Sequence, residues 1–341
     1  MTSETVTIKD VAAFAGVSTA TVSRALSGDP RVTEETRQKV AEAAEKLQYD
    51  MNHAARSLKM KATRTIGILA PELANDFFME IAQGVENELA LSGYTILLCS
   101  SRESFEEEEK RLRLLRERGV DGIIVFPSGN QSSHLKRVID RGTPLVLIDR
   151  SVEGLVSDAV LVNNEGASYE ATRALIEDGH KRIGFLGGNL NILTSRERFE
   201  GYFRAMAEAN LAMEPNFVKF GDMHSGSGYA MMKEMLSQPD PPTAYFIVNH
   251  FMHIGATTYV MSQTDYRQSK VIFASFDEMF YASLLPFCRY GVAQPMAEMG
   301  KVAAHLLLDR INGKERAFPE IIRLETRLIK HPAVGLDTAI V

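Results

Sequence analysis

A repeated strand–helix pattern that begins at Thr65 constrains the fold of this chain more than any other feature. Short apolar runs rich in β-branched residues, such as TIGILA, DGIIVF, PLVLID and RIGFLG, alternate with amphipathic segments such as FFMEIAQGVENELALSG. Apolar strands separated by helices indicate parallel sheets that are covered on both faces. One open sheet rarely exceeds about ten strands without splitting. The pattern therefore predicts an α/β fold with two doubly wound parallel-sheet lobes and a cleft between them.

The residues that follow the predicted strands are the candidate ligand-binding residues, because open parallel sheets bind ligands at the carboxyl ends of their strands. They are Asn75, Phe77, Phe78, Asp149, Arg150, Arg196, Arg198, Asn249, His250 and Asp277. Guanidinium groups, carboxylates and aromatic faces are usual in sites for sugars and nucleosides. The alternatives are a surface ion pair for Asp149 with Arg150, a solvated helix face for both Arg196 and Arg198, and core packing for the two phenylalanines.

Residues 7 to 26 predict two short helices joined by a tight turn. Thr7 is suited to cap the first helix, with Asp10 three residues on, and Gly16 is suited to end it. Ser18 is suited to cap a second helix a few residues later, which is the spacing of a helix-turn-helix unit. The second helix carries small and polar side chains that suit contacts with DNA: Thr19, Ala20, Thr21, Ser23 and Arg24. The alternative is a small helical docking unit that meets no DNA.

A third helix and a weaker helical segment follow this pair. Thr33 predicts the start of the third helix, with Glu34 and Glu35 in its first turn, where acids suit the helix dipole. Residues 52 to 59 predict a helix too short to be stable alone in water, so that a partner has to order it. Residues 1–64 carry ten Lys/Arg and eight Asp/Glu, a balance of +2, which leaves 28 against 36, or −8, in the rest. This asymmetry has the sign expected for a DNA-binding head on an acidic body.

Several classes of protein are disfavoured by what the sequence lacks. The first ten residues, MTSETVTIKD, contain no basic region followed by an apolar run, which a secretory signal peptide would have. No apolar stretch of the sequence is long enough to span a bilayer. We therefore expect a cytoplasmic protein with no membrane partner. Cys99 and Cys288 are expected to be free thiols. His250 and His253 have a spacing that can hold a metal, but no further ligand is near in sequence, so we expect no metal and no cofactor. GFLGG is not GxGxxG, and the chain lacks GxxxxGK[ST], HExxH and GxSxG, so we do not expect an enzyme.

Several segments carry a specific resemblance to a known family. The runs IKDVA, AGVSTATVSRAL and VTEETRQKV, followed by ARSLK before TRTIGIL, resemble the DNA-binding headpiece and hinge of the lactose-repressor (LacI) family of bacterial transcription regulators. The similarity continues through the chain. It implies a repressor that binds double-stranded operator DNA as a homodimer and is controlled by a small polar effector, a sugar or a nucleoside, bound between the lobes. A sugar receptor of the periplasmic kind is the rival interpretation, which the headpiece disfavours.

The resemblance also implies boundaries: a headpiece at 1–50, a hinge at 51–62, and a body at 63–341 that is similar to periplasmic binding proteins. Within the body, the first lobe is expected at about 63–162 and 292–322, and the second at about 163–291 and 323–341. In this family the hinge helix folds on DNA, and Leu58 matches a leucine that wedges into the minor groove; the alternative is a plain linker. The implied DNA contacts are Thr7, Ser18, Thr19, Ala20, Thr21, Ser23, Arg24, Asn52, Ala55, Leu58 and Lys59.

The resemblance points most directly to Arg198, in the RxxGY/F pattern, and to Asp277, in a GFDD-like turn, as effector contacts. Two departures from the family pattern limit what can be transferred. His250 replaces an acidic residue of relatives, so that no relative's effector preference can be copied, and Met51 stands near a position where many relatives have proline. The tail after Ile329 has no leucine heptads, so tetramers formed through such a tail are not expected.

Overall fold

The computed structural model describes residues 6–26, 29–49, 62–266, 269–279, 281–284, 287–315 and 317–332. The chain divides into two compact units, Met1–Thr63 and Arg64–Val341. None of the helices in the described ranges is long and apolar enough to cross a membrane. The hinge segment, residues 51–61, lies outside the described residues.

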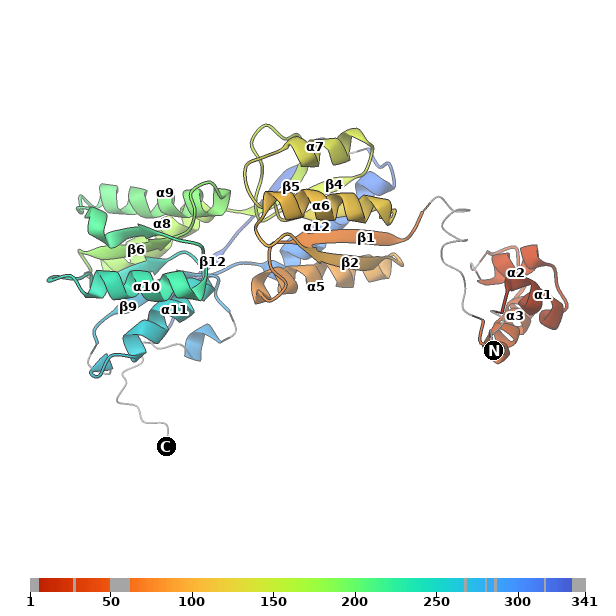
Figure 1. Cartoon of the computed structure of the whole chain (residues 1–341), viewed down its shortest axis with the longest axis horizontal. Helices are drawn as coiled ribbons and strands as arrows, with labels where there is room; N and C mark the ends of the chain where they lie inside the picture. The colour runs from red at the N-terminus through yellow and green to blue at the C-terminus, as the bar shows by residue number, and fades with distance from the viewer. Residues whose placement is uncertain are drawn as a thin grey trace. The chain divides into compact units, whose positions relative to one another are not determined.

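The described part of the first unit contains three helices (Figure 1): α1 (Ile8–Ala15), α2 (Thr19–Leu26) and α3 (Glu34–Lys46). Each helix contributes a fully buried valine to a shared core, Val11, Val22 and Val40 respectively. The turn between α1 and α2 begins at Gly16, whose φ of 66° is a left-handed conformation that favours glycine. The predicted helix-turn-helix unit is therefore present.

The second unit contains two six-stranded sheets. The first sheet has the order β11-β5-β4-β3-β1-β2, and all its strand pairs are parallel. Its strands are β1 (Thr65–Ala70), β2 (Thr95–Ser100), β3 (Gly122–Val125), β4 (Leu145–Ile148), β5 (Asp158–Val162) and β11 (Ile321–Leu324). The second sheet has the order β12-β10-β9-β8-β6-β7, in which only β12 runs antiparallel to its neighbour. Its strands are β6 (Ile183–Gly187), β7 (Val218–Phe220), β8 (Ala244–Ile247), β9 (Ile272–Phe276), β10 (Cys288–Ala293) and β12 (Arg327–Lys330).

Helices cover both faces of each sheet (Figure 1). Around the first sheet lie α5 (Asp76–Leu91) and α12 (Met296–Ile311) on one face, and α6 (Phe105–Glu117) and α7 (Ser133–Asp140) on the other. Around the second lie α8 (Asn164–Glu177) with α9 (Leu193–Glu208), and α10 (Ser225–Leu236) with α11 (His250–Met261). Two 3₁₀ turns, Pro215–Phe217 and Ala282–Leu284, complete the described elements. The predicted fold class, two doubly wound lobes after a small helical headpiece, is confirmed.

The chain passes between the two sheets after β5, after β10 and again after β11. The second passage delivers α12 to the first lobe, where it packs closely on α5. A Cβ atom on Gly84 would lie 2.5 Å from the carbonyl oxygen of Ala297, and one on Gly300 would lie 2.2 Å from that of Ile81. The two helix backbones can approach this closely only because both positions are glycine.

A buried ion pair fixes the returning segment to the first sheet. The carboxylate of Asp158, which starts β5 and is fully buried, accepts hydrogen bonds from Arg310 Nε at 2.7 Å and Nη2 at 3.0 Å. It also accepts the backbone N–H of Glu320, next to β11, at 2.8 Å. Arg310 lies on α12, so one carboxylate connects three elements that are distant in sequence.

Replacing Arg310 with methionine leaves the Asp158 carboxylate buried without its guanidinium partner. We expect the free energy of unfolding to fall by about 3–5 kcal/mol, the usual cost of an uncompensated buried charge. Urea unfolding followed by circular dichroism measures the loss. The control Arg173→Met removes an exposed guanidinium that pairs with Glu177 at 3.0 Å, and it should cost less than about 1 kcal/mol. Equal losses for the two variants would contradict the role given to the buried pair.

Candidate effector pocket and DNA-binding surface

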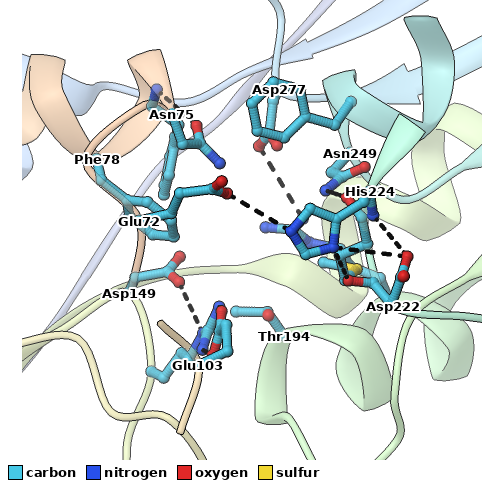
Figure 2. A pocket seen from close by; sticks show the side chains of 15 residues that line it. Glu72, Asn75, Phe78, Glu103, Asp149, Thr194, Asp222, His224, Asn249 and Asp277 are labelled. Carbon is cyan, nitrogen blue, oxygen red and sulfur yellow. Dashed lines mark hydrogen bonds and ion pairs between the residues drawn. The ribbon is translucent and has the colours of Figure 1, made fainter. Parts of the chain in front are cut away.

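A polar pocket lies where the carboxyl ends of the strands of both sheets meet (Figure 2). Its volume is about 50 Å³. The lining residues come from segments that follow β1, β2, β4, β7, β8 and β9 and from the first or second turns of α5, α9 and α11. They are Glu72, Asn75, Phe77, Phe78, Glu103, Asp149, Arg150, Thr194, Arg198, Asp222, Met223, His224, Asn249, Phe251 and Asp277.

Each lobe contributes an asparagine that caps a helix beside the pocket. Asn75 follows β1, and its Oδ1 accepts the backbone N–H of Phe77 at 3.0 Å. Asn249 follows β8, and its Oδ1 accepts the N–H of Met252 at 2.9 Å, while its Nδ2 donates to the carbonyl of Met223 at 2.8 Å. An N-cap side chain that accepts such a bond stabilises the first turn. The two lobes therefore present matching helix N-termini to the pocket.

Each lobe also contributes a buried aspartate with a left-handed backbone. Asp149 follows β4 with a φ of 67°, and Asp277 follows β9 with a φ of 66°. Aspartate tolerates this conformation better than most residues, but it still costs energy, and such strained residues cluster at ligand sites. The surrounding structure holds both carboxylates at the pocket at that cost.

Both pocket arginines are already bound by protein groups. Arg150 donates to both carboxylate oxygens of Glu103 at 2.8 Å and to the carbonyl of Pro127 at 3.0 Å, and its Nε lies 3.3 Å from Asp149 Oδ2. Arg198 donates to Asn164 Oδ1 at 2.9 Å and to the carbonyl of Val248 at 2.7 Å.

The guanidinium of Arg198 also lies 3.7 Å from the centre of the Phe276 ring and 4.0 Å from Asp277 Oδ1. Because these bonds use three of the five N–H donors of Arg150 and two of the five of Arg198, both side chains help to hold the pocket walls in place.

The two buried aspartates differ in pKa although their backbones match. Burial raises the pKa of Asp149 to about 6, which the neighbouring charge of Arg150 only partly opposes. Burial acts in the same direction on Asp277, but His250 and Arg198 outweigh it and hold the pKa of Asp277 below its ordinary value. Gln294 Nε2 also donates to Asp277 Oδ1 at 2.6 Å. Asp277 is therefore the firmly ionised carboxylate of the pocket.

An exposed histidine connects the two lobes at the pocket. His224, after β7, has its Nε2 3.7 Å from Glu72 Oε2 of the first lobe and its Nδ1 3.6 Å from Asp222 Oδ1 of the second (Figure 2). The Nδ1 atom also lies 2.8 Å from the Asp222 carbonyl oxygen. The contact with Glu72 crosses between the lobes, so a change in the angle between them would alter it.

The pocket brings together most of the residues predicted as ligand-binding: Asn75, Phe77, Phe78, Asp149, Arg150, Arg198, Asn249 and Asp277. His250 is buried behind this surface, with Nδ1 3.5 Å from Asp277 Oδ2, and does not line the pocket. Arg196 is half-buried and is also outside the lining. Asp149 and Arg150 do not form a surface pair, because both are buried. The lining residues that sequence reasoning missed are Glu72, Glu103, Thr194, Asp222, Met223, His224 and Phe251.

The candidate DNA-binding side chains lie on the surface of the first unit. Ser18, Thr19, Ala20 and Arg24 are exposed, and Thr21 and Ser23 are half-buried. Ser18 Oγ accepts the N–H of Thr21 at 3.1 Å and so caps the start of α2. Thr7 is exposed before α1, where its N–H and hydroxyl both donate to Asp10 Oδ2. The hinge candidates Asn52, Ala55, Leu58 and Lys59 lie outside the described residues, and their roles stay predictions.

Comparisons with known proteins match both units. Residues 7–52 match the family "Bacterial regulatory proteins, lacI family", and residues 63–332 match "Periplasmic binding proteins and sugar binding domain of LacI family". The HTH-type transcriptional repressor PurR of Aliivibrio salmonicida is 36% identical over 311 residues, which cover 90% of this chain and 93% of that protein. The PurR repressor of Vibrio campbellii is 36% identical over 324 residues, which cover 93% of this chain and 97% of that protein.

Solved structures agree with this assignment. The transcriptional regulator CelR in complex with cellobiose is 29% identical with a TM-score of 0.71, over 95% of this chain and 98% of that one. The Lac repressor dimer bound to operator and an anti-inducer has a TM-score of 0.84 at 23% identity, over 96% and 98% of the two chains, which is a likeness of fold. The chain therefore belongs to the lacI family of bacterial regulatory proteins, and it is a DNA-binding transcriptional repressor with a small-molecule-binding domain.

Proposed function

We propose that this repressor binds a neutral metabolite rich in hydroxyl groups, of the sugar or nucleoside class, in the pocket between the two lobes. The observation that carries the proposal is the excess of carboxylates in the lining. The carboxylates are those of Glu72, Glu103, Asp149, Asp222 and Asp277, against the cationic side chains Arg150 and Arg198 and the histidine His224.

This charge pattern selects for ligands that donate hydrogen bonds. Ionised carboxylates only accept hydrogen bonds, and the two arginines already donate to protein groups, Arg150 through three of its five N–H donors and Arg198 through two. A ligand phosphate or carboxylate would meet an excess of negative charge in the lining, whereas hydroxyl groups would find acceptors in both lobes. The rings of Phe77, Phe78 and Phe251 add apolar faces that can pack on a sugar or base ring. The solved complex of CelR with cellobiose, a neutral sugar, supports this class.

We infer that the bound ligand controls operator affinity through the angle between the lobes. Asn75, Phe77 and Arg150 contact it from the first lobe, and Arg198 and Asp277 from the second. A ligand held from both sides favours one lobe angle, and it changes DNA affinity only by its difference in affinity for the two states. The hinge at residues 51–62 lies between headpiece and body in sequence, and a short helix there needs partners to form. The lobe angle would decide whether two hinges come together, with Leu58 as the minor-groove wedge.

The assembly that fits this role is a homodimer on a near-palindromic operator, because one recognition helix reads only a few base pairs. The Lac repressor structure, a dimer on its operator, supports the same arrangement here.

We also propose that binding, and not catalysis, is the activity of the pocket, since the sequence has none of the nucleotide-binding or nucleophile motifs and the relatives are repressors. A repressor of bacterial operators acts in the cytoplasm, where the chromosome lies.

Thr19 and Ala20 are proposed to choose the operator sequence, because both are exposed in the first turn of α2. The double variant Thr19→Asn, Ala20→Gln should change the preferred bases by about 1–3 kcal/mol per altered base contact, as measured by selection from a random DNA library. Arg24→Gln, by loss of a phosphate contact, should weaken binding to all sequences and lower the salt slope by about one unit. The control Ala41→Gln, exposed on α3, should leave both unchanged. A double variant that selects the wild-type operator would contradict the assignment.

The charge of the pocket predicts which ligands stabilise the protein. In a thermal-shift screen, neutral sugars and nucleosides are each paired with their phosphorylated form. We expect stabilisation by a neutral compound, about 2.7 kcal/mol at 100 times its dissociation constant, and none by its phosphate. Asp277→Asn should reduce this shift, and Asp265→Asn, an exposed aspartate of the second lobe, should not. If only the phosphorylated partners stabilise the protein, the proposed ligand class is wrong.

A further inference from the structure

A second cluster of ligand-forming side chains lies in the second lobe, outside the pocket lining. A carboxylate oxygen of Glu278, the sulfur of Cys288 and an imidazole nitrogen of His331 all lie within 4.8 Å of one another. All three side chains are largely buried: those of Glu278 and His331 are 12% and 9% exposed, and residue Cys288 is 6% exposed. The effector pocket uses none of them.

Three neighbouring strands bring these residues together. Glu278 follows β9, Cys288 starts β10 and His331 follows β12, and the three strands are adjacent in the sheet. The register of β10 with β9 shifts between Cys288 and Tyr290, as at a β-bulge. An extra residue in a pleated strand changes the face to which the neighbouring side chain points, and bulges recur beside functional sites.

The backbone around the cluster is held by hydrogen bonds. The N–H of Glu278 donates to the carbonyl of Val292 at 2.9 Å. The N–H of His331 donates to the carbonyl of Arg289 at 2.9 Å, and Arg289 Nη1 donates to the carbonyl of His331 at 2.7 Å. The backbone that carries Glu278 and His331 is therefore held in place before an ion binds, which lowers the entropy cost of binding.

A thiolate, an imidazole and a carboxylate form a common ligand set for Zn²⁺, and softer ligands of this kind disfavour Mg²⁺ and Ca²⁺. From zinc bond lengths of about 2.0–2.3 Å, two ligand atoms of a tetrahedral site lie roughly 3.3–3.7 Å apart. His331 Nε2 and Glu278 Oε2 are already 3.1 Å apart, so the sulfur is the atom that must approach. Three bonds to the metal form, from sulfur, from the carboxylate oxygen and from the imidazole nitrogen. The thiol proton of Cys288 leaves to solvent, and the proton that His331 Nε2 shares with Glu278 moves to Nδ1 or to solvent.

We propose that Glu278, Cys288 and His331 bind one divalent transition-metal cation of the zinc class, with a fourth position open to water or a ligand. The plain alternative is a buried hydrogen bond between Glu278 and His331 beside an inert thiol. The metal would join β10 and β12 to the residue that directly follows Asp277, and so would hold that aspartate of the effector pocket in place. The metal proposal does not depend on the proposed effector class.

Titration of the tag-free, metal-stripped full-length chain with Co²⁺ distinguishes the two interpretations. We expect one equivalent to bind, with a thiolate-to-cobalt charge-transfer band in the near ultraviolet that Zn²⁺ abolishes by displacement. Cys288→Ser should remove this band, and His331→Gln should weaken Co²⁺ binding at least tenfold. Cys99→Ser and His305→Gln are matched controls in the first lobe, with a half-buried thiol and an exposed imidazole, and they should leave the titration unchanged.

The wild-type chain alone decides the first part of this test, so that it does not rest on variants that fold poorly. No charge-transfer band at equimolar Co²⁺ would overturn the proposal. A band that persists in Cys288→Ser, or that disappears in Cys99→Ser, would also overturn it by placing the ion elsewhere. Thermal melts of the metal-free variants show whether each is folded. Zn²⁺ should raise the melting temperature of wild type and of Cys99→Ser but not that of Cys288→Ser.

Discussion

Parallel strand pairing is the constraint on which the rest of the second unit depends. Because neighbouring strands run in the same direction, all their carboxyl ends meet at one edge, and each connection must cross a face of the sheet as a helix. In this protein the carboxyl ends of β1, β2 and β4 in the first sheet lie across the pocket from those of β7, β8 and β9 in the second. The pocket residues are therefore loop and first-turn residues, while the apolar strands form the rigid cores that position them.

The pocket is acidic because carboxylates outnumber arginines in its lining, and both arginines already donate hydrogen bonds to protein groups. Arg150 is held by Glu103, and Arg198 by Asn164 and the carbonyl of Val248, so that each guanidinium fixes a wall. Burial raises the pKa of Asp149 to about 6, because the charge of the neighbouring Arg150 only partly opposes the loss of solvent. Ligand hydroxyl groups are then the natural partners of the remaining acceptors. Far from the pocket, the guanidinium of Arg310 likewise compensates the charge of the buried Asp158 carboxylate.

The sequence predicts the two lobes well, because long apolar runs at regular spacing leave few alternatives. It does not predict the edge strands β7, β11 and β12. β7 has only three residues, and β11 and β12 place exposed or half-exposed residues such as Ile321, Arg327 and Lys330 along their length, since an edge strand needs no apolar face on both sides. Asp222 and His224 were missed with β7, because the rule that finds pocket residues needs the strand first.

Helix geometry and tertiary packing explain the other differences between the predicted and observed pocket. Successive helical residues are about 100° apart, so Arg196 and Arg198 point in opposite directions and only one can face the ligand. His250 packs behind Asp277, where its role is to favour the ionised carboxylate. The cluster of Glu278, Cys288 and His331 is invisible to a search by spacing, because its ligands come from separate strands that only the folded sheet places together.

We propose that one ligand in this pocket and operator DNA are coupled through the same pair of lobe arrangements. The most direct test measures operator affinity with and without the stabilising ligand, and ligand affinity with and without operator. The two ratios should agree and lie at about 5- to 150-fold. In Asp277→Ala, ligand-free operator affinity should stay near that of wild type, and the ratio at the same ligand concentration should fall towards one. A ligand that fills the pocket of the wild-type protein and leaves operator affinity unchanged would contradict the account.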